Sequence, residues 1–374
     1  MDGDDGTVRL TRVTFDDLAG WAADDHATAL TALRRTALHV ADDGPHRTGR
    51  LGIRGETLLP ALERSLMVSD REARAFFEAL FTPHRVEGEG LGGPDGRGFV
   101  TGFYEPVIDA ALERDDTYRF PIHAKPPELV RNDGSGGLDP AYAWGVRDAD
   151  GAMVEAPDRA AIETGALEKQ PPFDGWPVIA WARDRIELFI VHVQGAARLR
   201  LPDGSIRRIT YAAKSGHPFT GIGRELVAMG ELTEGRVTLR AIREWLAAHP
   251  ERVDELLRRN RSYIFFREAE VTDPALGPVA AARVPLAPGR SLAVDRLLHT
   301  FGTPVFVEVP GLAYEGRTFE RLMIAQETGT AIVGAARGDI FTGSGYAAGE
   351  VAGAITHPAT FTLLLPRDTG PSPG

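Results

Sequence analysis

The feature that most constrains the fold is a series of short apolar runs in the last third of the chain. Six runs of three to six residues, rich in β-branched and aromatic side chains, follow one another closely after residue 262. Runs this short predict strands rather than helices, and their close spacing favours a closed barrel over an open sheet. The runs are Tyr263–Phe266, Leu292–Val294, Val305–Val309, Leu322–Ala325, Ala331–Val333 and Thr360–Leu365.

The first 83 residues have the opposite character and predict helices. Asp25 is a suitable N-cap for a helix whose apolar residues recur at helical spacing. Ser69 and Glu72 have the spacing of a capping box, in which each side chain satisfies a backbone amide of the other residue. We therefore expect helices ahead of the first strands.

A glycine-rich stretch separates these helices from a mixed middle section. Two strand-like runs, Arg85–Glu87 and Phe99–Ile108, flank a turn at Pro94-Asp95-Gly96, so the pattern predicts a β-hairpin. The β parts before and after the middle section could form one barrel. The domain boundaries predicted are 1–112 for the N-terminal helices and the first barrel part, 113–261 for an inserted domain, and 262–374 for the second barrel part.

Composition narrows the possible partners. The 374 residues carry a formal net charge of -11, which argues against a nucleic-acid backbone as the main partner because phosphate binding needs a basic surface. The sequence contains no cysteine, so disulfides, thiolate metal sites and cysteine nucleophiles are excluded. It also lacks the metal-binding patterns formed by two histidines, or by a glutamate and a histidine, on one helix turn. We therefore expect no metal site.

Targeting signals are not visible in the sequence. The acidic start, Met1-Asp2-Gly3-Asp4-Asp5, has no apolar run behind it, so no secretory signal and no lipoprotein cysteine are recognised. No stretch approaches the roughly 18 apolar residues that a membrane-spanning helix needs. The expectation is a chain without a membrane span.

Two carboxylates stand out in the segment 322–343. Glu327 and Asp339 lie on either side of a glycine-broken turn, so both could face one cleft if the segment folds back on itself. Asp339 stands between Gly338 and the bulky Ile340, where partial loss of solvent would raise the pKa of its carboxyl group and suit a general acid. The alternative is a solvated aspartate in a turn, which is the commoner role of a Gly-Asp pair.

Further polar residues are held between glycines or aromatic residues elsewhere in the chain. Each has a structural explanation when taken alone: a core position for Tyr104, a backbone contact for Gln194, a surface charge for Lys214 and a turn ion pair for Asp295. The stretches are Thr101-Gly102-Phe103-Tyr104-Glu105-Pro106, Val193-Gln194-Gly195, Tyr211-Ala212-Ala213-Lys214-Ser215-Gly216-His217 and Ala293-Val294-Asp295-Arg296.

Taken together and in this order, these stretches resemble the MltA family of membrane-bound lytic murein transglycosylases. The resemblance runs from about Thr101 to Pro366. The same register includes Asn260-Arg261-Ser262-Tyr263-Ile264-Phe265-Phe266, Val284-Pro285-Leu286 and Gly338-Asp339-Ile340-Phe341.

The resemblance implies a mainly β protein with helices. Its centre would be a double-psi β-barrel made from two separated chain parts, with an inserted β-rich domain facing it across a groove. It also implies that the substrate is the glycan strand of peptidoglycan, cleaved between N-acetylmuramic acid and N-acetylglucosamine to leave a 1,6-anhydro end. A periplasmic or outer-membrane-associated location follows from the same resemblance, which also implies that no organic cofactor is needed.

The resemblance assigns roles to individual residues. Asp339 matches the catalytic aspartate and would act first as an acid and then as a base. Tyr104 could stack on a sugar, and Gln194, Gly195, Lys214 and Ser215 could bind the substrate. Asp295 and Glu327 would orient Asp339 or support its loop. This chain has Glu327 where family members usually have aspartate, Thr330 for a glycine, Val333 for a basic residue, and Ser215 for asparagine.

Two alternatives stay open. Glu327 or Asp295 could activate a water molecule, which would make the protein an inverting glycan hydrolase with two carboxyl groups. The altered segment 327–334 is also compatible with a glycan-binding protein that does not cleave its ligand.

Overall fold

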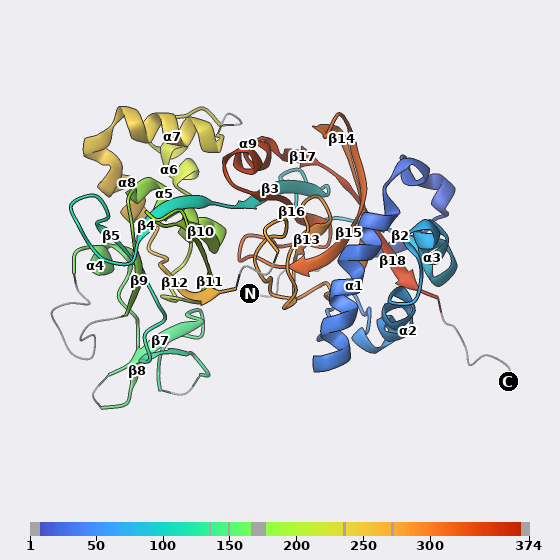
Figure 1. The fold of residues 1–374 in the computed structure, drawn as a ribbon, viewed down its shortest axis with the longest axis horizontal. Helices are drawn as coiled ribbons and strands as arrows, with labels where there is room; N and C mark the ends of the chain where they lie inside the picture. Colours follow the sequence, from blue (N-terminus) through green and yellow to red (C-terminus); the bar gives the residue numbers. More distant parts are fainter. Residues whose placement is uncertain are drawn as a thin grey trace. The chain divides into compact units, whose positions relative to one another are not determined.

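The chain divides into two compact units in a computed structural model, which describes residues 8–134, 136–148, 150–165, 177–234, 237–270 and 273–367. The first unit contains Met1–Tyr104, Asp273–Gly343 and Val351–Gly374. The second contains Glu105–Thr272 and Ser344–Glu350. Both units are drawn in Figure 1. These two units divide at 104/105 and 272/273, and the short segment 344–350 returns to the second unit. The domain boundaries at 112/113 and 261/262 stay predictions.

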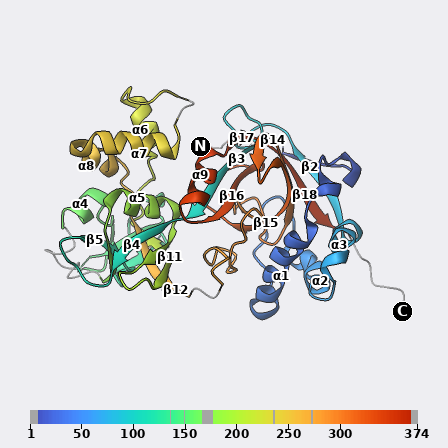
Figure 2. The ribbon, with the colours of Figure 1, turned by 45° about the horizontal axis from the view of Figure 1, so that its top comes forward.

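A nine-stranded sheet forms the centre of the first unit among the described residues, in the order β1-β2-β18-β14-β15-β13-β16-β3-β17. This strand order has two ends, so its hydrogen bonds do not complete a closed barrel. Together with the helices, the sheet makes the fold mixed α/β. Figure 2 shows the sheet curving from β14 through β16 and β3 to β17. The strands are β1 (Arg9–Arg12), β2 (Phe81–Glu87), β3 (Phe99–Glu105), β13 (Ser291–Val294), β14 (Pro304–Tyr314), β15 (Arg317–Glu327), β16 (Arg337–Ser344), β17 (Thr356–Pro358) and β18 (Thr360–Pro366).

Helices α1 (His26–Asp43), α2 (Gly55–Ser65) and α3 (Ala73–Leu80) belong to the first unit. The predicted N-cap is confirmed, because Asp25 accepts a hydrogen bond from the amide of Thr28 at the start of α1. The predicted capping box of Ser69 and Glu72 is also confirmed, at a short 3₁₀ helix before α3. In Figure 1 the three helices lie together beside β15, β2 and β18.

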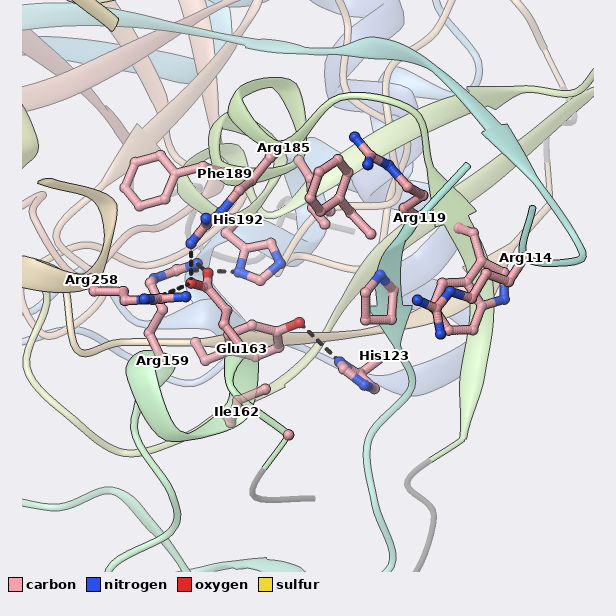
Figure 3. A pocket seen from close by; sticks show the side chains of 16 residues that line it. Arg114, Arg119, His123, Arg159, Ile162, Glu163, Arg185, Phe189, His192 and Arg258 are labelled. Carbon is pink, nitrogen blue, oxygen red and sulfur yellow. Dashed lines mark hydrogen bonds and ion pairs between the residues drawn. The ribbon is translucent and has the colours of Figure 1, made fainter. Parts of the chain in front are cut away.

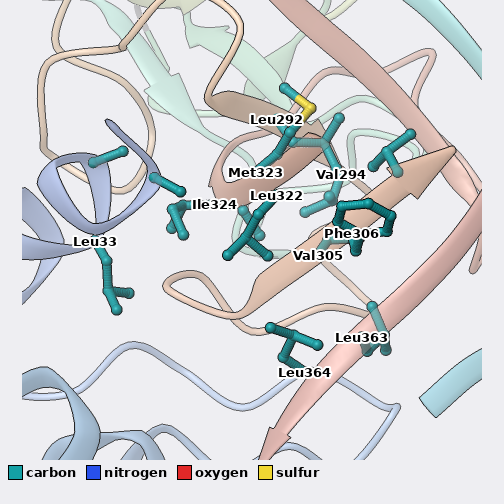
Figure 4. Packing of buried hydrophobic residues seen from close by; sticks show 14 of the residues in the cluster. Leu33, Leu292, Val294, Val305, Phe306, Leu322, Met323, Ile324, Leu363 and Leu364 are labelled. Atoms are coloured by element: carbon teal, nitrogen blue, oxygen red, sulfur yellow. The ribbon is translucent and has the colours of Figure 1, made fainter. Parts of the chain in front are cut away.

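The main core lies between α1 and the central strands of this sheet. Leu33 of α1 and Ile324 of β15 are fully buried, as are Phe306 of β14 and Leu363 of β18. Figure 4 shows these side chains packed together with Leu292 and Val294 of β13. Each such side chain contributes about 1.5–3 kcal/mol to folding through removal from water. Strand β13 is buried along its whole length, which makes it a fixed support for its two neighbours, β15 and β16.

The second unit contains a six-stranded sheet in the order β12-β11-β10-β4-β9-β5 and a three-stranded sheet, β6-β7-β8, within the described residues. Its strands are β4 (Val107–Ala111), β5 (Phe120–His123), β6 (Leu129–Arg131), β7 (Trp144–Arg147), β8 (Met153–Val154), β9 (Val178–Ala182), β10 (Ala196–Arg200), β11 (Ile206–Lys214) and β12 (Ile264–Ala269). Its helices are α4 (Arg159–Glu163), α5 (Arg185–Gln194), α6 (Ile222–Ala228), α7 (Leu239–Ala248) and α8 (Val253–Arg259). Helix α9 (Tyr346–Ala354) contains residues of both units.

Two sequence predictions were wrong. The runs Arg85–Glu87 and Phe99–Ile108 do not pair as a hairpin: β2 pairs with β1 and β18, and β3 pairs with β17. Pro106, which lacks an amide hydrogen, separates β3 from β4, and the two strands join different sheets. The run Ala331–Val333 is a loop rather than a strand, because the chain turns where the amide of Ile332 donates to the carbonyl of Gly329. The other five apolar runs overlap β12, β13, β14, β15 and β18.

Candidate active site

Asp339 is held in the middle of the first unit's sheet. It lies on β16, between β13 and β3, and is paired with Ala293 of β13. Its neighbours Gly338 and Ile340 are buried, whereas Asp339 itself keeps partial exposure. The side chain therefore has limited contact with solvent while remaining reachable.

A polar chain orients the carboxylate. Thr101 of β3 donates its hydroxyl hydrogen to Oδ1 of Asp339. Nη2 of Arg337 donates in turn to the hydroxyl oxygen of Thr101 at 2.7 Å. Arg337 also donates to the carbonyl of Gly338, so the guanidinium group is itself fixed. Alternate residues of a strand lie on one face, which places Arg337 and Asp339 on the same side of β16.

The electrostatic environment raises the pKa of the Asp339 carboxyl above its ordinary value. Burial is the main cause, because loss of solvent disfavours the charged form. The positive charge of Arg337 and the hydrogen bond from Thr101 act in the opposite direction and limit the rise. The result is a carboxyl group that keeps its proton to a higher pH than an exposed aspartate and is held in one orientation, as a general acid requires.

Glu327 lies across β13 from Asp339. It ends β15 and is paired with Ala293, the same residue that Asp339 pairs with from the other side. Two strand spacings put the two Cα atoms about 10 Å apart. Burial raises the pKa of Glu327 to about 7, although its carboxylate accepts hydrogen bonds from the amides of Thr328, at 2.8 Å, and Ala281, at 3.2 Å.

Asp295 is attached to the loop that leads into β16. Its Oδ2 accepts a hydrogen bond from the amide of Gly334 at 2.9 Å, and its Oδ1 accepts one from the amide of Leu297 at 2.9 Å. Gly334 has φ +123°, and a Cβ atom there would lie 2.6 Å from the Cα of Gly92. Asp295 thus fixes the segment before Arg337 by hydrogen bonds, and close backbone packing at Gly334 fixes it further.

The remaining predicted site residues lie on other elements. Tyr104 is the last residue of the first unit's opening segment, and its side chain is 4% exposed. Its stacking on a sugar stays a prediction, because the ring would first have to become accessible. In the second unit, Gln194 ends α5, and Gly195 is its C-cap with φ 78°. Both are partly exposed.

Lys214 and Ser215 follow one another at the end of β11. Lys214 is partly exposed, and burial lowers the pKa of its ammonium group. Ser215 is fully buried, and its hydroxyl oxygen accepts the amide hydrogen of Tyr263 at 3.1 Å. That bond joins β11 to the start of β12, so the predicted contact of Ser215 with substrate stays a prediction.

Two residues of the site were not given roles from the sequence. Arg337 could have been recognised because it stands two positions before Asp339, at the spacing that puts two side chains on one face if the segment is a strand. Thr101 lies 238 positions from Asp339, and no local pattern connects the two residues. Within the described ranges, no group of three or more histidine, aspartate or glutamate side chains is arranged to hold a metal ion. The described helices also include none with the length and apolarity to cross a bilayer.

Comparisons with known protein families and structures agree with this arrangement. A family model described as the MltA specific insert domain matches residues 99–267, and one described as the 3D domain matches residues 290–365. Membrane-bound lytic murein transglycosylase A from Escherichia coli K12 is 33% identical over 273 residues, which are 71% of this chain and 65% of the relative. The protein of the same name from Vibrio cholerae is 30% identical over 281 residues, 73% of this chain and 67% of the relative.

Solved structures match over nearly the whole chain. The crystal structure of a membrane-bound lytic murein transglycosylase from Agrobacterium tumefaciens has a TM-score of 0.87 at 48% identity and covers 96% of this chain and 98% of that one. The monoclinic form of MltA from Neisseria gonorrhoeae has a TM-score of 0.77 at 31% identity and covers 97% of this chain and 94% of that one. Likeness of this extent in both sequence and fold shows that the chain belongs to the MltA family of lytic murein transglycosylases.

Proposed function

We propose that this protein is a peptidoglycan lytic transglycosylase that uses Asp339 as its only acid and base. The observation that carries the proposal is the state of Asp339: a partly exposed carboxyl group with a raised pKa, oriented by Thr101 in a chain of the MltA family. The relatives named lytic murein transglycosylase A support the same reaction class.

The reaction needs one proton to move twice. The protonated carboxyl group of Asp339 gives its proton to the oxygen of the bond between N-acetylmuramic acid and N-acetylglucosamine as that bond breaks. The carboxylate then takes the proton from the 6-hydroxyl of the same muramic acid, whose oxygen bonds to C1 and closes the 1,6-anhydro ring. Asp339 ends protonated, as it began, and no water is consumed.

The other polar residues would position this group or the glycan. Thr101 and Arg337 hold the carboxylate, while Asp295 holds the loop before β16. Glu327 would support the turn after β15 through its contact with Thr328. We retain Tyr104, Gln194, Gly195, Lys214 and Ser215 as the proposed substrate-contacting residues.

A double-psi β-barrel is the proposed description of the first unit's sheet. Strand β17, at one end of the hydrogen-bonded order, also packs against β14. The six strands β14, β15, β13, β16, β3 and β17 therefore return toward their starting point, with β13 and β15 running parallel. An experimental structure with continuous hydrogen bonds between β17 and β14 would establish closure.

The relatives' printed names also bear on location. They describe membrane-bound murein transglycosylases, so we propose that this chain acts at peptidoglycan in the periplasm or at the outer membrane. Fractionation of cells that express the natural protein, followed by immunodetection, tests this directly.

Digestion of purified peptidoglycan with mass detection tests the reaction. The expected products carry 1,6-anhydro-muramic ends, and Asp339→Asn is expected to abolish them while leaving the protein folded. Asp116→Asn is a suitable control, because Asp116 is exposed and forms no hydrogen bond within the described part of the chain.

Two results would replace the proposal. Reducing-end sugars without anhydro ends would favour an inverting hydrolase. Glu327, whose pKa of about 7 suits a base near neutral pH, would then be the first candidate to activate water. Binding of glycan strands without any cleavage would favour a glycan-binding protein.

A further inference from the structure

The second unit contains a cavity that the proposed reaction does not use. Its volume is about 380 Å³, which is within the range of small-molecule binding sites. Residues of β5, β9, α4, α5 and α8 line it. It belongs wholly to the second unit, whereas Asp339 belongs to the first.

The lining is strongly basic in a chain that is acidic overall. Five arginines line the cavity, and Glu163 is its one acidic lining residue within the described part of the chain. Glu163 pairs with Arg185 at 2.5 Å, with Arg159 at 3.2 Å and with Arg258 at 3.4 Å. Asp254, outside the lining, pairs with two of them, Arg185 and Arg258. This side of the cavity is therefore a compact and largely neutralised network.

The opposite side carries positive charge without such compensation. Arg114 lies 5.5 Å from the ring centre of Trp181, and Arg119 lies 5.6 Å from that of Phe120. Neither guanidinium group forms an ion pair with a described residue. Figure 3 shows Arg114 and Arg119 on one side, Glu163 with its three arginines on the other, and His192 between them. The uncompensated positive charge thus lies on one side of the cavity, away from Glu163.

A buried donor at the cavity wall has no partner. His192 is 5% exposed, and its Nδ1 lies 3.2 Å from Nη2 of Arg159. A guanidinium group can only donate, so Nδ1 accepts and Nε2 carries the hydrogen. That Nε2 is buried without a hydrogen-bond partner among the described residues. An unpaired buried donor costs about 1–3 kcal/mol, and an acceptor brought into the cavity would remove this cost.

The uncharged part of the lining is aromatic and aliphatic. Trp181 and Phe120 lie beside the free arginines, and Phe189 and Ile162 lie near the arginine network. A bare inorganic anion would leave these surfaces uncovered. A ligand with both an anionic oxygen group and an apolar chain would contact the guanidinium groups and the rings together.

We propose that this cavity is a binding site for the carboxylate of a short peptide, with His192, Arg114 and Arg119 as the recognising residues. The identity of this peptide rests on the proposed function: it is the acidic stem peptide attached to the glycan strands of peptidoglycan. The site would then hold the peptide part of the substrate in a unit separate from the one that carries Asp339.

Calorimetric titration of the whole protein with the glycan-free stem peptide tests the inference. The free peptide is expected to bind, and the same peptide with amidated carboxyl groups to bind at least about tenfold more weakly, which corresponds to about 1.4 kcal/mol. Arg119→Gln and Arg114→Gln are each expected to weaken binding of the free peptide by a similar factor. Arg224→Gln is the matched control, because Arg224 is an exposed arginine of the same unit outside the cavity.

Three results would overturn the inference: no binding of the free peptide, equal binding of the amidated peptide, or equal losses in the Arg119 and Arg224 variants. Inorganic phosphate that binds as tightly as the peptide would show a simple anion site and would also overturn it. The titration involves no cleavage and can be repeated with Asp339→Asn. Peptide binding without anhydro products rejects the proposed function alone, and anhydro products without peptide binding reject this inference alone.

Discussion

Thr101 donates its hydroxyl hydrogen to the carboxylate of Asp339 across 238 positions of sequence. The same hydroxyl oxygen accepts a hydrogen bond from Arg337, which stands two residues before Asp339. The carboxylate of Asp339, the proposed acid, is thus oriented by one residue of a neighbouring strand and one of its own strand. This relationship explains how the carboxyl group of Asp339 can be desolvated and still be held in a fixed direction.

Replacement of Thr101 by valine removes this hydrogen bond while keeping the shape of the side chain. The bond lowers the pKa of Asp339, so its loss raises that pKa further and moves the alkaline limb of the pH–rate profile to higher pH. The maximal rate is expected to fall roughly tenfold because the carboxyl group is less well oriented. Rates of anhydro-end formation across pH provide the measurement, with Thr101→Ser as a control that restores the hydroxyl. An unchanged profile in Thr101→Val would contradict the assigned role.

Replacement of Glu327 by glutamine changes how stability depends on pH. The folded-state pKa of Glu327, about 7, lies above its ordinary value of 4.5, so ionisation is disfavoured in the folded protein. The free energy of unfolding therefore decreases as pH rises from about 4.5 to about 7, by up to about 3 kcal/mol. Glutamine cannot ionise, and Glu327→Gln should lose this decrease.

Urea unfolding at pH 5 and pH 8 measures the effect as the difference between Glu327→Gln and the unsubstituted protein. Contributions from other titrating groups cancel in that difference. Glu113→Gln, at an exposed position, is the control and should follow the unsubstituted protein. A parallel decrease in Glu327→Gln would show that Glu327 does not carry the effect.

Replacement of Asp295 by alanine removes the acceptor for the amides of Gly334 and Leu297. Each amide left without a partner costs about 1–3 kcal/mol, so the melting temperature should fall. Because the segment before β16 loosens while the proposed glycan-binding residues are unchanged, kcat is expected to fall with little change in KM. Asp295→Asn keeps a side-chain oxygen that can accept a hydrogen bond, so it should recover part of the melting temperature and part of kcat. Equal kinetics for Asp295→Ala and the unsubstituted protein would reject the positioning role.

Replacement of Gly334 by alanine tests the close packing of the same loop. A Cβ atom would lie 2.6 Å from the Cα of Gly92 and 2.7 Å from the carbonyl oxygen of Leu91, at a φ of +123°. The expected destabilisation is more than about 3 kcal/mol, because backbone atoms on both sides must move. Gly96→Ala is the matched control: its φ is +77° but nothing lies within 4 Å of the added atom, so about 1–2 kcal/mol is expected. Chemical denaturation compares the two variants, and equal losses would show that packing at Gly334 is loose.

Local patterns determined several elements from the sequence alone. Asp25 and the pair Ser69 and Glu72 marked helix starts, because a cap is made within three or four residues and needs no distant partner. Five apolar runs of the last third overlapped strands for a similar reason: their length and branching already disfavour helix. The ordered motifs between Thr101 and Phe341 also identified the family, which the comparisons confirm.

Tertiary structure decided which elements meet. The two runs around Pro94-Asp95-Gly96 look like a hairpin, yet their strands join different neighbours, because burial against β18 and β16 outweighs a local turn. Strand order decides that Glu327 and Asp339 both pair with Ala293. It also decides that Thr101 contacts Asp339. Strand order is fixed by the burial of side chains from distant segments in a common core. The sequence therefore pointed to Asp339 as the proposed acid, and only the fold decided which groups orient its carboxyl group and set its pKa.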